Sequence, residues 1–266
     1  MRVINSCLIL AKKNKVTSIS IIWEKNNYLN ADFNDLFYPI DQLKFVDNIY
    51  IFNYTLIKNK KLFSSLNKIS KLKYMFLSLF YSSYKFYDDK NIHKLRFREQ
   101  YWDKGHKKSV FDTCEDFFQY SSSLNFYSLF KPKDNLAKSI ISIRNIFSIN
   151  TIGLHVRRTD HLLSHSFSTI NLFFDEIEKY IRKSPDTTFY LATDDPKIQK
   201  ELYSRYGSII ISNINKDYSR DSIEGIKDAV IDLFLLSNTR LIFGSYYSSF
   251  SDVASWIKNT PMKVIK

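Results

Sequence analysis

The second half of the chain alternates strand-like and helix-like runs, and this alternation limits the possible fold more than any other feature. The strand-like runs are short, apolar and β-branched, whereas the runs between them carry apolar residues at helical spacing. Such alternation predicts a parallel sheet wound by right-handed crossovers. The expected strands are residues 151–157, 187–193, 208–212, 240–245 and 262–266, and the expected helices are residues 171–182, 197–206, 222–236 and 249–257.

The first half of the chain is less regular. Because the clean alternation starts at residue 151, we expect one α/β domain over residues 1–148 and a second over residues 149–266. The chain begins with an expected helix, without the strand that a βαβ unit needs before it, so the first domain is expected to be incomplete at its start. The patterns predict helices at 3–11, 58–87, 111–120 and 135–147, a buried strand at 16–23 and a further strand at 48–53.

A strong positive charge indicates the kind of partner. The 266 residues carry a formal net charge of +12, which attracts phosphate in nucleic acid, anionic lipid or a nucleotide-sugar. No signature of a nucleic-acid-binding fold is present, so we do not expect nucleic acid as a partner. The lysine-rich helix expected at 58–87 is interpreted as a core-packing helix with a solvated basic face. Peripheral contact with an anionic membrane surface is the alternative interpretation.

The cellular location is inferred from cysteines and apolar runs. The two cysteines, Cys7 and Cys114, lack metal-ligand spacing and indicate free thiols in a reducing compartment. No apolar run reaches the length of a bilayer-spanning helix, and the first residues lack the small-residue site of a cleaved signal peptide. We therefore expect a cytoplasmic protein, either free or peripheral on the inner face of the membrane.

The sharpest motif is HVRRTD at residues 155–160, directly after an expected strand. Ligands of doubly wound sheets lie beyond the carboxyl ends of the strands. Arg157 and Arg158 repel each other and need an anionic partner, and the planar guanidinium matches phosphate oxygens. The motif therefore predicts phosphate binding. Ion pairs from the two arginines to Asp160 or another carboxylate are an equally weighted alternative.

Two aspartates, Asp194 and Asp195, stand directly before Pro196 at the end of a second expected strand. Proline favours the first position of a helix, so one of these aspartates is expected to cap that helix. Paired aspartates also occur in metal sites, but no histidine or further carboxylate lies nearby in the sequence to complete a ligand set. We therefore expect neither a metal nor a cofactor.

A hydroxyl-rich segment, GSYYSS at residues 244–249, follows a third expected strand and leads into a helix. Hydroxyls and backbone N–H groups at a helix start form an anion site, while a serine cap is the plain alternative. Asp232 lies in an apolar run and needs a hydrogen-bond donor, which a purine base or a backbone or arginine partner would supply. Three strand ends thus bring arginines, carboxylates and hydroxyls to one edge of the sheet.

The segments HVRRTD, FYLATDDP and DLFLLSNTRLIFGSYYSSF, in this order and spacing, resemble the three motif blocks of the GDP-fucosyltransferase superfamily. The likeness is strongest to the α1,6-fucosyltransferases, including the nodulation-type bacterial enzymes. It covers residues 151–260 and extends more weakly to residues 20–37. The resemblance implies an α/β, GT-B-like fold of two Rossmann-like parallel-sheet domains. The family's usual opening strand and Gly-Asn-Arg-type loop are not matched at the start of this chain.

The resemblance also implies roles for single residues. Arg157 would bind the β-phosphate of the donor, with Arg158 assisting. Asp160 is a candidate general base, as are His161 and His165. The remaining implied roles are guanine contact for His155 and Asp232, ordering of the nucleotide pocket for Asp194 and Asp195, and contact with the diphosphate for Ser248 and Ser249.

These observations favour an enzyme. We expect a glycosyltransferase that moves a sugar, fucose from GDP-fucose by the resemblance, to a glycan acceptor in bacterial surface polysaccharide biosynthesis. By the resemblance the transfer is metal-independent and inverts the anomeric carbon. The alternative hypothesis is a catalytically inactive module that binds a nucleotide or a glycan and lacks the N-terminal donor loop.

Overall fold

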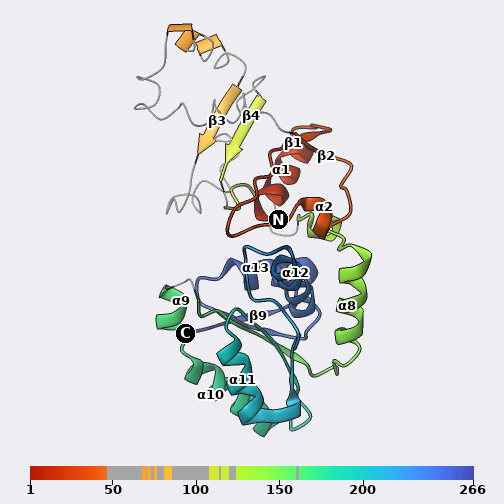
Figure 1. Cartoon of the computed structure of the whole chain (residues 1–266), viewed down its shortest axis with the longest axis vertical. Helices are drawn as coiled ribbons and strands as arrows, with labels where there is room; N and C mark the ends of the chain where they lie inside the picture. The colour runs from red at the N-terminus through yellow and green to blue at the C-terminus, as the bar shows by residue number, and fades with distance from the viewer. Residues whose placement is uncertain are drawn as a thin grey trace. The chain divides into compact units, whose positions relative to one another are not determined.

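The computed structural model describes residues 1–46, 81–85, 108–113, 115–119, 124–159 and 162–266, with short helical pieces at residues 68–69, 71–72 and 75–76. The chain forms two compact units (Figure 1). The first unit consists of Met1–Trp23 and Pro39–Phe126, and the second of Glu24–Tyr38 and Tyr127–Lys266.

The second unit is built on a five-stranded parallel sheet with the order β7-β6-β5-β8-β9. All neighbouring strands pair in parallel, so the predicted parallel α/β sheet is confirmed. The strands are β5 (Ile152–Val156), β6 (Phe189–Thr193), β7 (Ile210–Ile211), β8 (Ile242–Ser245) and β9 (Met262–Ile265).

The helices of the second unit follow the predicted pattern. The five helices predicted between residues 135 and 257 are confirmed, with ends shifted by up to three residues. The short helix α9 was not predicted, because six residues are too few to show a helical period. The helices are α2 (Phe33–Leu36), α8 (Asp134–Arg144), α9 (Leu162–Phe167), α10 (Ile170–Lys183), α11 (Pro196–Tyr206), α12 (Ile223–Ser237) and α13 (Ser249–Lys258), with short 3-10 turns η1 (Tyr127–Leu129) and η2 (Gly207–Ile209).

One face of the sheet packs against α10 and α11. Leu154 and Val156 of β5 share a fully buried cluster with Phe173 and Ile177 of α10 and with Leu202 of α11. Alternate strand residues point to one face, which explains why every second residue of β5 enters this cluster. Burying each large apolar side chain stabilises the fold by about 1.5–3 kcal/mol.

The opposite face of β5 lies close to α12, and a glycine permits this approach. A Cβ at Gly153 would lie 2.9 Å from Cδ2 of Leu236 and 2.9 Å from Oγ1 of Thr239. Any larger residue would force the strand and helix apart. The tight packing fixes the position of β5 relative to α12, and with it the position of the carboxyl end of β5.

A segment from the N-terminal region belongs to the second unit. Phe37 forms a β-bridge with Pro132, and its ring lies 5.5 Å from that of Phe130 and 6.4 Å from that of Phe234. The unit thus includes residues 24–38 and helix α8, all of which precede the boundary expected at residue 149.

The first unit contains the predicted N-terminal helix and two short parallel strand pairs. Helix α1 (Arg2–Lys13) buries Ile9 and Leu10 against Phe117 and Phe118. The strand pairs are β1 (Ile19–Ile21) with β2 (Leu43–Phe45), and β3 (Tyr81–Lys85) with β4 (Lys108–Asp112).

Two predictions for the first part of this unit are corrected. The strand expected at 16–23 has only three residues and is not buried, with Val16 51% exposed. The end of the helix expected at 58–87 is instead strand β3, since its apolar positions at helical spacing stop at Phe80. The expected strand at 48–53, and most of the rest of 58–87, lie outside the described residues.

The helix expected at 111–120 is also wrong. Residues 108–112 form a strand, and the described residues from 113 to 119 are not helical. The hydroxyl of Ser6 accepts hydrogen bonds from the backbone N–H groups of Phe117 and Phe118, at 3.1 and 3.3 Å. Contacts with α1 therefore replace the local helix that the sequence favours.

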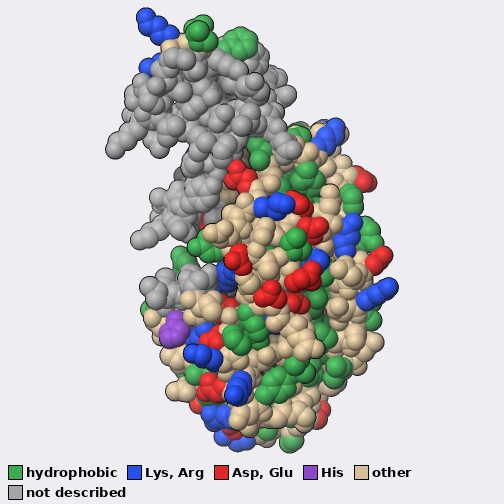
Figure 2. All heavy atoms as spheres, viewed as in Figure 1, with side chains coloured by type: hydrophobic (Ala, Val, Ile, Leu, Met, Phe, Trp, Pro, Cys, Tyr) green, Lys and Arg blue, Asp and Glu red, His purple; other side chains and the backbone are tan. Residues whose placement is uncertain are grey.

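Positive and negative side chains are interspersed on the surface of the described residues. On the face drawn in Figure 2, lysine and arginine side chains lie among acidic ones. Among the described residues, no helix combines the length and the apolar character needed to cross a bilayer.

The packing predicts a large difference between two isoleucines. Ile177 in α10 is fully buried, whereas Ile141 in α8 is 57% exposed. We expect Ile177→Ala to lower the free energy of unfolding by about 2–5 kcal/mol, because it leaves a cavity under the sheet. The matched variant Ile141→Ala should change it by less than about 0.5 kcal/mol. Urea denaturation measures both, and equal effects would contradict the packing described for α10.

Candidate functional site

The sheet order places a topological switch point between β5 and β8. From β5 the chain proceeds through β6 and β7 on one side, and β8 and β9 lie on the other. His155 pairs in register with Ala192 of β6 and with Gly244 of β8. The residues that follow each of these strands therefore emerge at the same edge, which is where open α/β sheets bind ligands.

A serine holds the first residue beyond β5. The backbone N–H of Arg157 donates to Oγ of Ser245 at 3.1 Å, and that hydroxyl donates to the carbonyl oxygen of His155 at 3.0 Å. Ser245 thus links the ends of β5 and β8. Arg157 is half-buried at this edge.

Asp194 holds the next two residues. Its carboxylate accepts hydrogen bonds from the backbone N–H groups of Arg158 at 2.7 Å and Thr159 at 3.3 Å, and from the hydroxyl of Thr159 at 2.7 Å. The guanidinium of Arg158 donates to the carbonyl oxygen of Ser168 at 2.6 Å. Asp194 therefore contacts the backbone of Arg158, and the guanidinium of Arg158 contacts a carbonyl group.

Asp195 caps helix α11, as predicted. Its carboxylate accepts from the backbone N–H of Lys197 at 2.8 Å, and Pro196 occupies the first helical position. A cap of this kind leaves the carboxylate tied to the helix start.

His155 is buried with an unused nitrogen. Its side chain is 7% exposed and its ring is stacked on that of Phe250, with 4.9 Å between centroids. The buried Nδ1 has no hydrogen-bond partner among the described residues. Burial lowers the pKa of His155 to about 3; the charge of Asp194 opposes this shift, and the charge of Arg157 adds to it. The imidazole is therefore neutral near pH 7, with one ring nitrogen that no described residue uses.

The start of α13 offers a second unused polar atom. Ser248 stands at the N-cap position, but its buried hydroxyl makes no hydrogen bond with the described residues. Ser249 is the first helical residue and is half-buried. Tyr247 precedes them with a φ of 59°, in the left-handed region that is uncommon for a non-glycine residue. A helix start with a spare hydroxyl suits an anion.

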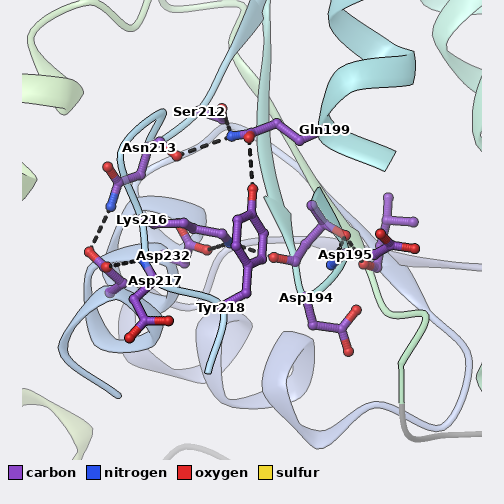
Figure 3. A network of polar contacts seen from close by, with 12 residues as sticks. Asp194, Asp195, Gln199, Ser212, Asn213, Lys216, Asp217, Tyr218 and Asp232 are labelled. Carbon is purple, nitrogen blue, oxygen red and sulfur yellow. Dashed lines mark hydrogen bonds and ion pairs between the residues drawn. The ribbon is translucent and has the colours of Figure 1, made fainter. Parts of the chain in front are cut away.

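Asp232 is buried and already has partners. Its Oδ1 accepts from the hydroxyl of Tyr190 at 2.5 Å. Its Oδ2 lies 2.7 Å from Nζ of Lys216, which is drawn beside it in Figure 3. The donors are thus a tyrosine and a lysine, where the sequence left a purine base, a backbone group or an arginine open. Both oxygens retain further lone pairs.

Of the three candidate general bases, the structure describes only His165. Asp160 and His161 lie outside the described residues, and His165 is exposed on α9. No group of three or more metal-ligating side chains occurs in the part of the chain that the structure describes.

Sequence reasoning missed several residues of this edge. Ser168, Lys216 and Arg220 come from connecting segments, and Tyr190 lies inside a strand that reads as plain core. The only available signal was the unmet need of Asp232 for a donor. The need of Asp232 for a donor does not show which residue of the polar segment 213–221 supplies it.

Comparison with known families identifies one match. The family model described as alpha-(1,6)-fucosyltransferase N- and catalytic domains matches residues 120–260. This range contains the ends of β5, β6 and β8 with all the site residues described above.

Solved structures show the same fold. The chain is similar to the fucosyltransferase NodZ from Bradyrhizobium, with a TM-score of 0.56, 15% identity, and coverage of 95% of this chain and 86% of that one. A NodZ alpha-1,6-fucosyltransferase soaked with GDP-fucose gives the same values. An Arabidopsis thaliana FUT1 mutant in complex with GDP matches with a TM-score of 0.53 and 16% identity, covering 88% of this chain and 61% of that one. The predicted α/β, GT-B-like fold class is confirmed.

The buried imidazole predicts a specific dependence of stability on pH. The ordinary histidine pKa of 6.5 applies to the unfolded chain, and the pKa in the folded chain is about 3. As the pH falls below 6.5, only the unfolded chain gains this proton, so stability present above pH 6.5 is lost towards pH 3. Between pH 7 and 5, wild type should lose on the order of 2 kcal/mol more than His155→Asn. Urea denaturation at each pH measures this difference.

The control for this prediction is His165→Asn, because that side chain is exposed in the folded chain. It should retain the pH dependence of wild type. Parallel pH profiles for wild type and His155→Asn would contradict the buried, neutral imidazole.

Proposed function

Because the chain belongs to the alpha-(1,6)-fucosyltransferase family, and is therefore a glycosyltransferase, we propose that it transfers fucose from GDP-fucose to a glycan acceptor. One observation carries the proposal: within the matched residues, paired arginines, a neutral buried histidine and a helix start with a spare hydroxyl meet at one edge of the sheet. The GDP-fucose and GDP named for the similar structures support the choice of donor.

Arg157 is the proposed partner of the donor β-phosphate, with Arg158 assisting. Negative charge grows on the diphosphate as the bond to the sugar breaks, and a fixed guanidinium stabilises that charge more than it stabilises the bound donor. The start of α13, with Ser248 and Ser249, adds hydroxyl and backbone N–H donors to the same diphosphate. The hydrogen bond from Arg157 to Ser245 supports this role, because it fixes the backbone that carries the guanidinium.

The nucleotide is held by the remaining residues of the edge. The unused Nδ1 of His155 supports its proposed contact with guanine. A guanine contact to Asp232 would add to the bonds from Tyr190 and Lys216 and use the remaining lone pairs. Asp194 and Asp195 order the pocket by fixing the backbone after β5 and the start of α11.

The proposed transfer inverts the anomeric carbon and uses no metal. The acceptor hydroxyl oxygen attacks the anomeric carbon while the bond from that carbon to the β-phosphate oxygen breaks, and the electron pair leaves with GDP. The proton of the acceptor hydroxyl passes to a general base, for which Asp160, His161 and His165 are the candidates from sequence. Positive side chains at the strand ends provide the charge stabilisation that a metal supplies in other enzymes.

We propose that the reaction belongs to the biosynthesis of a bacterial surface polysaccharide, and the resemblance to the nodulation-type bacterial enzymes supports this proposal. Peripheral contact with an anionic membrane stays a prediction, because most of the basic stretch at 58–87 lies outside the described residues.

Replacement of Arg157 tests the proposed chemistry. We expect Arg157→Ala to lower kcat for transfer by a factor of about 100–1000 or more, because the charge on the leaving diphosphate loses its main partner. Arg158→Ala should reduce transfer only partly, since its guanidinium is held by the carbonyl of Ser168. The control is Arg182→Ala, whose side chain is exposed at the end of α10. Normal turnover by Arg157→Ala would refute the assignment.

A donor screen tests the nucleotide. Because a ligand that binds only the folded state raises the melting temperature, we expect GDP and GDP-fucose to stabilise the chain. UDP and CMP at equal concentration should have no effect. Stabilisation by UDP or CMP alone would contradict the guanine site. Stabilisation by GDP without any sugar transfer would instead support the inactive binding module.

A further inference from the structure

A buried ammonium group lies in the segment 213–221, between β7 and α12. The side chain of Lys216 is 7% exposed, and its Nζ lies 2.7 Å from Oδ2 of Asp232, whose side chain is 5% exposed. The same ammonium donates to the carbonyl oxygen of Thr193 and lies 4.7 Å from the ring centre of Tyr218. Lysine is almost never buried without a partner, and connecting segments normally expose it. The burial of Lys216 therefore indicates a particular role.

The ammonium joins elements that are distant in the sequence. Asp232 belongs to α12 and Thr193 ends β6, so Lys216 ties the segment to a helix and to a strand end at once. Removing one partner of such a pair leaves the other charge buried without compensation, so the position of Lys216 next to Asp232 is costly to change.

Further hydrogen bonds hold the same segment (Figure 3). The side chain of Asn213 and the backbone N–H of Asp217 both donate to Asp228 of α12, each at 2.8 Å. The hydroxyl of Tyr218 donates to Gln199 of α11 at 2.7 Å. These bonds thus fix residues 213, 217 and 218 on both sides of Lys216.

The segment brings a third arginine to the edge of the sheet. Nη2 of Arg220 lies 3.8 Å from Oδ2 of Asp194, the carboxylate that holds the backbone of Arg158. The charges of Arg220 and Lys216 also contribute to the low pKa of His155. Both positive groups therefore act on the same small region as the residues proposed to bind the donor.

Resting on the proposed function, we propose that Lys216 is a positioning residue that holds segment 213–221 so that Arg220 strengthens binding of the donor diphosphate. Lys216 itself is enclosed by protein and acts through the segment. Arg220, 38% exposed and tied to the carboxylate beneath Arg158, adds positive charge where the diphosphate binds. The inference assigns Arg220 to donor affinity and Arg157 to the charge that grows as the bond breaks. The carboxylate of Asp194 partly offsets the charge of Arg220, which attracts the diphosphate into the site.

Steady-state kinetics with GDP-fucose test this inference. We expect Lys216→Met and Arg220→Gln each to raise KM for GDP-fucose by about three- to tenfold, the usual range for a residue that acts through others. Their kcat values should stay within about twofold of wild type, as for a loss of uniform binding. Because both changes remove the same contribution, the double variant should raise KM no further than the stronger single variant.

Two variants serve as controls. Lys216→Arg keeps the charge next to Asp232 and should recover most of the donor affinity. Lys227→Met removes a lysine from an ion pair of similar length on the surface of α12, with Glu224, and should leave KM unchanged. A purely structural role for Lys216 would lower the melting temperature of Lys216→Met without changing its KM.

Several outcomes overturn the inference. One is an unchanged KM for Lys216→Met. Another is a KM of the double variant that equals the product of the increases in the two single variants. If Lys216→Met does not fold, Arg220→Gln still tests the inference, because it leaves the pair of Lys216 and Asp232 intact. An unchanged KM for Arg220→Gln contradicts the inference. Failure of the unsubstituted chain to bind GDP or transfer fucose would instead contradict the proposed function.

Discussion

Two hydrogen bonds that cross from the end of β5 to its neighbours hold the backbone on which the candidate site depends. One joins the N–H of Arg157 to Ser245 of β8, and the other joins the N–H of Arg158 to Asp194 beyond β6. Both need the three strand ends at the same level, which the parallel register and the close approach of Gly153 to α12 provide. The packing of the sheet thus determines the position of the backbone that carries the side chains of Arg157 and Arg158.

The same edge combines strong positive charge with buried neutral groups. The imidazole of His155 and the hydroxyl of Ser248 are buried and leave polar atoms unused, which costs stability. Such costs are expected where a fold is arranged for a ligand. A nucleotide diphosphate matches both features, since its phosphates need cations and its base needs hydrogen-bonding partners.

The sequence predicted the second unit well because its signals are local. Strands such as β5 and β6 are mostly apolar and are buried along their whole length, and Asp195 with Pro196 marks a helix start by its own chemistry. The first unit was predicted less well, because Ser6 of α1 takes the N–H groups of Phe117 and Phe118 that a local helix would use. The pairing of Lys216 with Asp232 was likewise not predictable, since it depends on how a polar segment closes over a strand end.

The central claim is that the guanidinium of Arg157 meets the diphosphate of the donor. A crystal structure of the chain with GDP bound tests this most directly. The account predicts β-phosphate oxygens within hydrogen-bond distance of Arg157 and of the start of α13, with guanine near His155. A diphosphate bound elsewhere, with Arg157 paired to a carboxylate, would contradict it.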